Sequence, residues 1–212
     1  MISSNKINNI CPLLMDSFMN TEIDNGIITS YSSFLKKSRK QLGQFENFIL
    51  KLHDSNIRSI LHIRDDLDIA LLDMSLSEKA YEIENRFTSG VGYIDFPLIL
   101  RFKKVNSARS YKVTEKGFLK RVRKEESKSK FIYLFEELLG ISESSICLAI
   151  VLFNNSGKIM KDRYRLLLVD AEKIEVIENH EKIWESHFDN QYLDIYREYR
   201  YTFPELLTKN GA

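Results

Sequence analysis

The residues best suited to chemistry are the basic side chains concentrated in one stretch of the chain. Residues 101–130 contain 12 Lys and Arg against 3 Asp and Glu, a net charge of +9, whereas residues 1–100 and 131–212 have net charges of −3 and −5. The formal charge of the whole chain, +1, conceals this asymmetry. Several cations on one surface neutralise phosphates and release counterions, which supplies much of the affinity for nucleic acids.

We therefore expect the basic stretch to contact the phosphates of DNA or RNA, with Phe102, Tyr111 and Phe118 available to stack on unpaired bases. The predicted nucleic-acid-binding residues are Arg101, Lys103, Lys104, Arg109, Lys112, Lys120, Arg121, Arg123 and Lys124. Two alternatives remain open. In the first, the cations only face water. In the second, the stretch docks on an acidic protein surface, which would make the protein an adaptor or inhibitor subunit with no nucleic-acid role.

A second candidate site is the acidic cluster in the sequence HIRDDLD. Asp66 and Asp68 offer the carboxylate oxygens that Mg²⁺ prefers. Restriction-type nucleases combine such an acid with an acid-x-Lys motif on the next strand, and Lys103 occupies the lysine position here. Arg101 stands where the second acid belongs. The alternative function is therefore a Mg²⁺-dependent, degenerate nuclease with Asp66, Asp68 and Lys103 as catalytic candidates, and a turn or N-cap role is the structural alternative for the aspartates.

An aromatic stripe marks the C-terminal part of the chain. Trp184, Phe188, Tyr192 and Tyr196 recur at every fourth position, which places them on one face of a helix. Tyr and Trp are favoured anchors of protein interfaces, so we predict that this face binds a partner chain or a second copy, with packing in the core as the alternative. His180 and His187 lack a third ligand, so no metal site is predicted there.

Composition and motifs exclude several protein classes. With 43% hydrophobic and 29% charged residues and only 8 Gly and 3 Pro, the chain is globular rather than disordered or collagen-like. No P-loop, dinucleotide-binding or serine-nucleophile motif is present, so we expect a binding protein rather than an enzyme, with no cofactor except Mg²⁺ under the nuclease alternative. No apolar window reaches about 18 residues, so no membrane partner is expected. The 2 cysteines lack disulfide or zinc spacing, which predicts a cytoplasmic location.

The elements that must position these residues are predicted to form one compact domain over residues 1–212. A helical part covers residues 1–56, a core containing the sheet covers 57–178, and the aromatic helix covers 179–203. The alternation of helices and strands favours an α/β or α+β class, with a central mixed sheet flanked by helices and a basic hairpin or helix excursion at 101–130.

Hydrophobic spacing predicts the individual elements. Helices are expected at residues 31–56, at 75–87 after the capping box of Ser75 and Glu78, and at 131–139, where Gly140 would be the C-cap. Strands are expected at 57–63, 93–105 with a hairpin partner at 110–114, and 146–153, whose continuous apolar run indicates burial on both faces. A final strand pair is expected at 164–169 and 174–177, turning around Asp170.

Overall fold

Antiparallel strands dominate the computed structural model of the protein, which describes residues 25–49, 52, 55–73, 96–114, 117–122, 131–154, 164–177 and 185–188. Within these ranges the helical elements are α2 (Asn25–Leu42) and the 3-10 helix η2 (Gly43–Phe48). The strands are β1 (Ser55–Ile63), β2 (Asp66–Asp73), β3 (Phe96–Val113), β4 (Leu119–Arg121), β5 (Phe131–Ile141), β6 (Ile146–Asn154) and β7 (Tyr164–Ile177).

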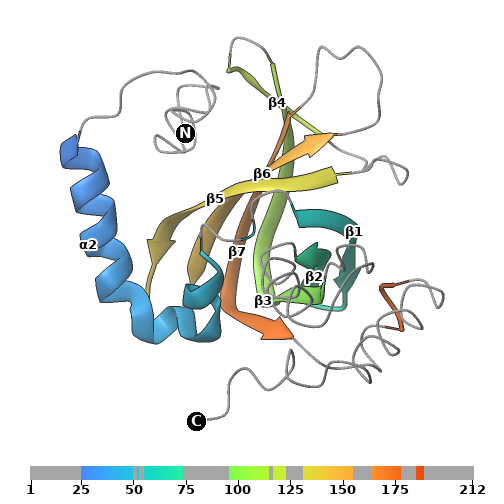
Figure 1. Ribbon diagram of the computed structural model, residues 1–212, viewed down its shortest axis with the longest axis horizontal. Coiled ribbons are helices and arrows are strands. Elements are labelled where there is room, and N and C mark those ends of the chain that lie inside the picture. The colour runs from blue at the N-terminus through green and yellow to red at the C-terminus, as the bar shows by residue number, and fades with distance from the viewer. Residues whose placement is uncertain are drawn as a thin grey trace, which may run out of the picture.

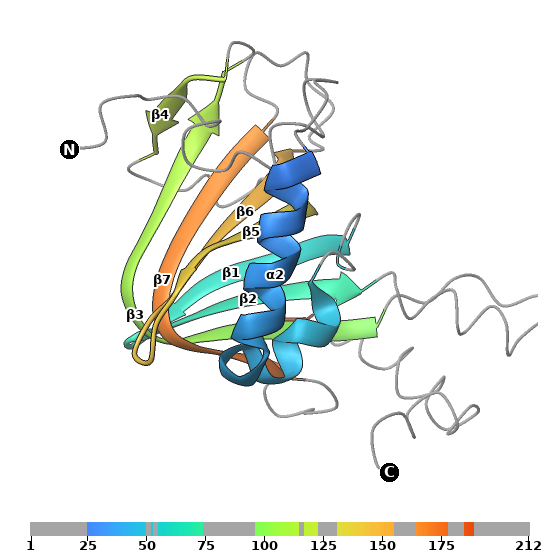
Figure 2. The same cartoon turned by 90° about the vertical axis from the view of Figure 1, so that its left-hand side faces the viewer.

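The strands of these ranges form one strongly curved sheet in the order β2-β1-β5-β6-β7-β3-β4 (Figure 1). Because β2 also pairs with β3, a closed ring is formed by six strands in the order β1, β2, β3, β7, β6 and β5. Strand β4 lies outside this ring and pairs with the last residues of β3. Helix α2 and η2 lie against the concave side of the curved sheet (Figure 2). Their side chains Leu42 and Phe45 join the main hydrophobic cluster with residues from all six strands of the ring.

The predicted mixed sheet flanked by helices is wrong. Each strand pairing among the described strands is antiparallel, and α2 is the one α-helix in the same part of the chain. The mixed class was predicted because the hydrophobic spacing indicated more helices and more short strands than the described residues contain. The segments predicted at 93–105 and 110–114 are one strand, β3, and those at 164–169 and 174–177 are one strand, β7, so no turn forms at Asp170.

The predicted helix at 131–139 is strand β5. Its apolar residues recur at helical spacing, but two β-bulges, between Tyr133 and Phe135 and between Leu138 and Gly140, shift the alternation along the strand. As a result Tyr133 and Leu138 join the interior cluster, whereas Leu134 and Phe135 pack against a second cluster on the convex face. A strand that is apolar on both faces and interrupted by bulges therefore imitates the period of a helix. Gly140 lies inside the strand and is not a C-cap.

Other predicted elements are confirmed or shortened. Strand β6 matches the apolar run predicted as a strand buried on both faces, since most of its side chains are buried. The first long helix ends as α2 at Leu42 and continues as η2 to Phe48, and β1 then begins at Ser55, within the segment predicted to be helical. The helix predicted at 75–87 and most of the predicted helix at 179–203 lie outside the described residues. No helix in the described part is both long and apolar enough to span a membrane.

A bulge in β3 determines where its basic residues point. Lys104 has a φ of 49°, and the register with β7 shifts between Val105 and Ser107. The Val105 N–H donates to the carbonyl of Asp65 at the tip of the β1–β2 hairpin, over 2.7 Å. β3 bends sharply here, as Figure 2 shows. Before the bulge it pairs with β2, and near its end it pairs with β4.

Candidate nucleic-acid interface

The predicted basic stretch does not form one surface. Because β3 is bent and alternate side chains of a strand point to opposite faces, the described cations of β3 and β4 in this stretch fall into three groups. The first group, Arg101, Lys103 and Lys104, lies at the bend. The second group, Arg109 and Arg121, lies on the convex face near the end of β3. The third group, Lys112 and Lys120, lies on the concave face of the same end.

At the bend, each cation has an acidic partner. The Arg101 guanidinium donates to both carboxylate oxygens of Asp68, over 2.7 and 2.6 Å, and Lys103 Nζ lies 2.5 Å from Asp66 Oδ2. Lys104 Nζ lies 2.7 Å from Glu172 Oε2. Asp68 stands directly opposite Arg101 in the antiparallel register of β2 and β3. The charges of these three side chains are therefore neutralised within the chain.

His187 extends the Asp68 ion pair across the convex face. Its Nε2 lies 3.0 Å from Asp68 Oδ2 and its Nδ1 lies 3.0 Å from Ser59 Oγ, and the His187 and Asp68 side chains are both fully buried. Burial raises the pKa of Asp68, but the hydrogen bonds from Arg101 and His187 and the charges of both groups outweigh it, so the pKa lies below its ordinary value. These contacts join residues 185–188 to β1 and β2.

The structure brings together the three candidates of the nuclease alternative, Asp66, Asp68 and Lys103, but it does so by pairing them with cations. Both carboxylate oxygens of Asp68 accept hydrogen bonds from Arg101, and those of Asp66 accept them from Lys103 and from the backbone N–H of Lys104. A Mg²⁺ ion would have to displace these donors, and Asp68 is inaccessible from solvent. Among the described side chains, no group of three potential His, Cys, Asp or Glu ligands converges.

We use the name β3–β4 end for residues 109–113, 118–122 and 164–168. It differs from the bend in that its exposed cations are not neutralised by described acidic side chains. Arg109, Lys120 and Arg121 are exposed, and within the described ranges none of them forms an ion pair. Tyr111 lies directly opposite Arg121, and these two residues share the convex face with Tyr164. The Tyr164 ring packs against Phe153, with the ring centroids 5.7 Å apart. Cations and aromatic side chains therefore stand side by side on this face.

The concave face of the β3–β4 end contains a row of three cations. Lys112 is directly opposite Lys120 on β4 and directly opposite Arg165 on β7. Sequence reasoning missed Arg165, because it lies outside the basic stretch. The available signal was a charged residue in the otherwise apolar sequence YRLLLV, which is buried in the structure.

The remaining predicted site residues divide into buried and undescribed ones. Phe102 is fully buried in the interior cluster, so it is not available to stack on a base. Phe118 is exposed, with 44% of its surface accessible. Phe188 is buried within this chain. Arg123, Lys124, Trp184, Tyr192 and Tyr196 lie outside the described residues.

Comparison of the chain with protein-family models, with curated proteins and with solved structures gives no match.

Proposed function

We propose that the protein is a cytoplasmic protein that binds single-stranded nucleic acid at the β3–β4 end of its sheet. The observation that carries this proposal is the contrast between the two ends of β3. The cations at the bend are neutralised by acids of the same chain, whereas Arg109, Lys120 and Arg121 have no such partner in the part of the chain that the structure describes. Two of these cations, Arg109 and Arg121, lie on the same convex face, and unneutralised cations on one surface attract phosphates.

The aromatic side chains favour a single-stranded ligand. Tyr111 and Tyr164 are half-buried and lie on the same convex face as Arg109 and Arg121. Unpaired bases stack on such rings without regard to sequence, while flanking cations contact the phosphates. In a duplex the base faces are already stacked, so only the phosphate contacts would remain.

The test is the affinity of the full chain for a labelled single-stranded oligonucleotide of about 12 nucleotides, measured by fluorescence anisotropy at several salt concentrations. We expect the double variant Arg109→Glu/Arg121→Glu to bind at least about tenfold more weakly, because two phosphate contacts become repulsive. The slope of log affinity against log salt should fall by about 1.4, since each contact to a single strand contributes about 0.7.

The matched control is Lys104→Glu/Lys173→Glu, which makes the same change in net charge at the bend, where both lysines are exposed and ion-paired. We expect this control to retain most of the affinity. An equal loss in both double variants would show that only net charge matters, and no binding of the wild-type chain to DNA or RNA at low salt would refute the proposal. Tyr111→Ala should weaken single-strand binding more than duplex binding.

A further inference from the structure

Three polar side chains form a continuous hydrogen-bonded chain on the convex face, beside the bend of β3. Ser59 Oγ on β1 lies 3.0 Å from His187 Nδ1, and His187 Nε2 lies 3.0 Å from Asp68 Oδ2 on β2. A serine next to an imidazole that is held by a carboxylate is the arrangement that activates a hydroxyl as a nucleophile. No local sequence motif reveals it, because Ser59 and His187 stand 128 positions apart.

The hydrogen-bond partners fix the position of each proton. Both carboxylate oxygens of Asp68 accept hydrogen bonds from Arg101, which holds the carboxylate in its ionised form. An ionised carboxylate can only accept, so His187 Nε2 carries the proton that it donates to Asp68. Nδ1 of the neutral imidazole is then an acceptor, and the Ser59 hydroxyl donates to it. The Ser59 proton therefore already points at a base.

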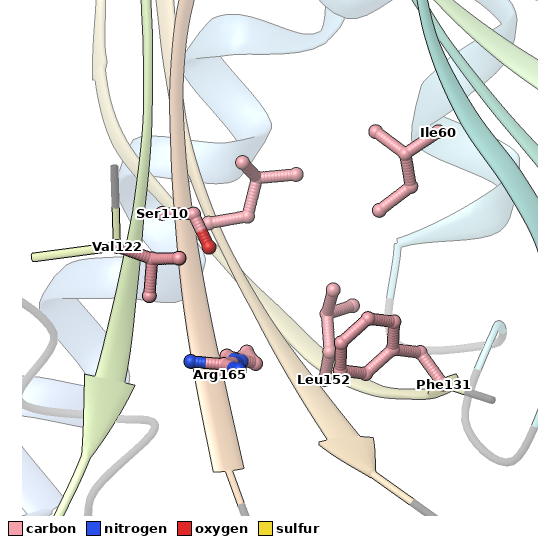
Figure 3. Close-up of a pocket in the computed structure, with 7 residues that line it drawn as sticks. Ile60, Ser110, Val122, Phe131, Leu152 and Arg165 are labelled. Atoms are coloured by element: carbon pink, nitrogen blue, oxygen red, sulfur yellow. The ribbon is translucent and has the colours of Figure 1, made fainter. Parts of the chain in front are cut away.

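A β-bulge brings Ser59 to this face. The register of β1 with β2 shifts between Ile57 and Ser59, which turns the two side chains to opposite sides although they are two positions apart. Ile57 belongs to the interior cluster, and Ile60, which follows Ser59, lines a small cavity on the same interior side (Figure 3). Ser59 is half-buried and can be reached from solvent, whereas the side chains of His187 and Asp68 are fully buried.

Apolar side chains continue along β1 on the face of Ser59. Leu61 and Ile63 follow at alternate positions without a register shift, so all three side chains point the same way. Leu61 is 38% exposed and Ile63 is 40% exposed. At about 3.4 Å per residue, Leu61 lies about 7 Å along the strand from Ser59. An apolar acyl group attached to Ser59 would therefore cover this strip.

We propose that Ser59 is the nucleophile of an esterase site, with His187 as the general base and Asp68 as the residue that positions His187. The substrate class is an ester of an apolar carboxylic acid. Serine hydrolases commonly use Nε2 as the base, and here Nδ1 takes that role because Asp68 holds Nε2. The site uses no residue of the β3–β4 end, so it is independent of the proposed nucleic-acid interface.

The reaction needs only water as a second reactant. Ser59 Oγ bonds to the ester carbonyl carbon while its proton moves to His187 Nδ1, and the bond from that carbon to the alcohol oxygen breaks as the alcohol takes the proton. A water oxygen then bonds to the acyl carbon and gives a proton to Nδ1, and the bond to Ser59 Oγ breaks as Oγ recovers that proton. The products are a carboxylic acid and an alcohol, and no atom is oxidised or reduced. Asp68 stabilises the imidazolium that forms in each step.

The experiment measures hydrolysis of p-nitrophenyl hexanoate and p-nitrophenyl acetate by the full chain. We expect the wild-type chain to hydrolyse the hexanoate above the buffer rate, and Ser59→Ala should lower kcat at least about hundredfold, because no acyl-serine can form. The hexanoate should have a kcat/KM about tenfold higher than the acetate, the effect of about two buried methylene groups. Leu61→Asn should remove most of this preference, and a preference for the acetate would overturn the substrate class.

Ser145→Ala is the matched control. Ser145 is also half-buried, and its hydroxyl donates to a carboxylate, Asp170 Oδ1, over 2.6 Å instead of to a histidine. The control variant therefore loses one hydroxyl and one hydrogen bond, as Ser59→Ala does, and we expect it to keep the wild-type kcat.

Asp68→Asn tests the positioning residue. The amide can donate to His187 Nε2, which moves the imidazole proton to Nδ1 and blocks the acceptor that Ser59 needs. We expect kcat to fall at least about tenfold while KM changes less than about threefold, and circular dichroism checks that the variant is folded.

A covalent label tests Ser59 in the wild-type chain, where no variant can fail to fold. A fluorophosphonate reacts when a serine oxygen bonds to phosphorus, fluoride leaves and the base takes the proton. Mass spectrometry should find the label on the tryptic peptide from Ser59 to Arg64, in which Ser59 is the one serine.

The outcomes separate this proposal from nucleic-acid binding. Absence of both hydrolysis and labelling in the wild-type chain would overturn the esterase site, as would a label on another serine. Equal losses of kcat in Ser59→Ala and Ser145→Ala would also overturn it, because the hydrolysis would then depend only on the stability of the fold. Oligonucleotide binding by Ser59→Ala should equal that of the wild-type chain in every case.

Discussion

Arg101 and Arg109 lie on the same strand, yet their surroundings give them different roles. The Arg101 guanidinium forms a bidentate ion pair with Asp68, whose side chain is fully buried, whereas Arg109 is exposed and forms no ion pair within the described ranges. Removing one partner of a buried pair leaves an uncompensated charge, which costs far more than losing an exposed pair. Arg101 therefore stabilises the fold, and Arg109 is available to a ligand.

We predict that Arg101→Met lowers the free energy of unfolding near neutral pH by about 3 kcal/mol, because Asp68 then stays buried without its main donor. Lys104→Met is the control, since its ion pair with Glu172 is exposed, and it should leave the free energy of unfolding nearly unchanged. Urea unfolding followed by circular dichroism measures both. A loss below about 1 kcal/mol for Arg101→Met would show that the pair contributes little net stability.

The lowered pKa of Asp68 also predicts how stability depends on pH. The pKa is lower in the folded state than in the unfolded state, where it is about 3.9, so the unfolded chain binds more protons in this range. The pair's stabilisation is therefore present above about pH 4 and is lost as pH falls through the folded pKa. Urea unfolding between about pH 5 and pH 2 should show this loss, and the loss should be smaller in Arg101→Met, where burial of Asp68 is less opposed.

At the scale of elements, β5 shows how bulges and burial on both faces override local periodicity. Its apolar spacing predicts a helix with Gly140 as the C-cap, but two bulges allow the segment to pair with β6 over its whole length and with β1 at its start. The two assignments make opposite predictions for Gly140. A helix C-cap requires positive φ, whereas in the strand Gly140 is not among the positive-φ residues and has open space around an added Cβ.

We therefore predict that Gly140→Ala stabilises the protein by about 0.5 kcal/mol, because alanine reduces the entropy of the unfolded chain without a clash in the folded one. Gly43→Ala is the contrasting variant. Gly43 begins η2 with a φ of 56°, so alanine there should destabilise the protein by about 1 kcal/mol despite the open space. Thermal unfolding of both variants decides the matter, and destabilisation by Gly140→Ala would contradict the strand assignment.

On the scale of the whole molecule, the ring of strands is closed by contacts of unequal extent. β6 is paired along its length with β5 and β7 and is buried on both faces, whereas β1 meets β5 through only three residue pairs, Ser55 to Ile57 with Phe131 to Tyr133. Local opening requires the least free energy where few contacts are lost. The β1–β5 seam is therefore the place where the ring opens first.

Hydrogen exchange followed by NMR tests this expectation. Amides in the middle of β6, such as those of Leu148 and Ile150, should exchange only through global unfolding, and amides of the β1–β5 seam should exchange at least about tenfold faster. Equal protection at the two places would mean that the ring opens only as a unit. The comparison needs no ligand and does not depend on the proposed function.

The sequence alone determined which segments are rich in charge and which are apolar enough to be buried. The buried strand β6 was predicted correctly, because an uninterrupted apolar run is a local property, and the +9 charge of residues 101–130 follows directly from composition. Tertiary structure alone decided which charges meet. Arg101 and Lys103 are neutralised by β2, while Arg165 joins Lys112 and Lys120 in one row. These contacts depend on the bulge in β3 and on the register of strands distant in the sequence, and neither leaves a local signal.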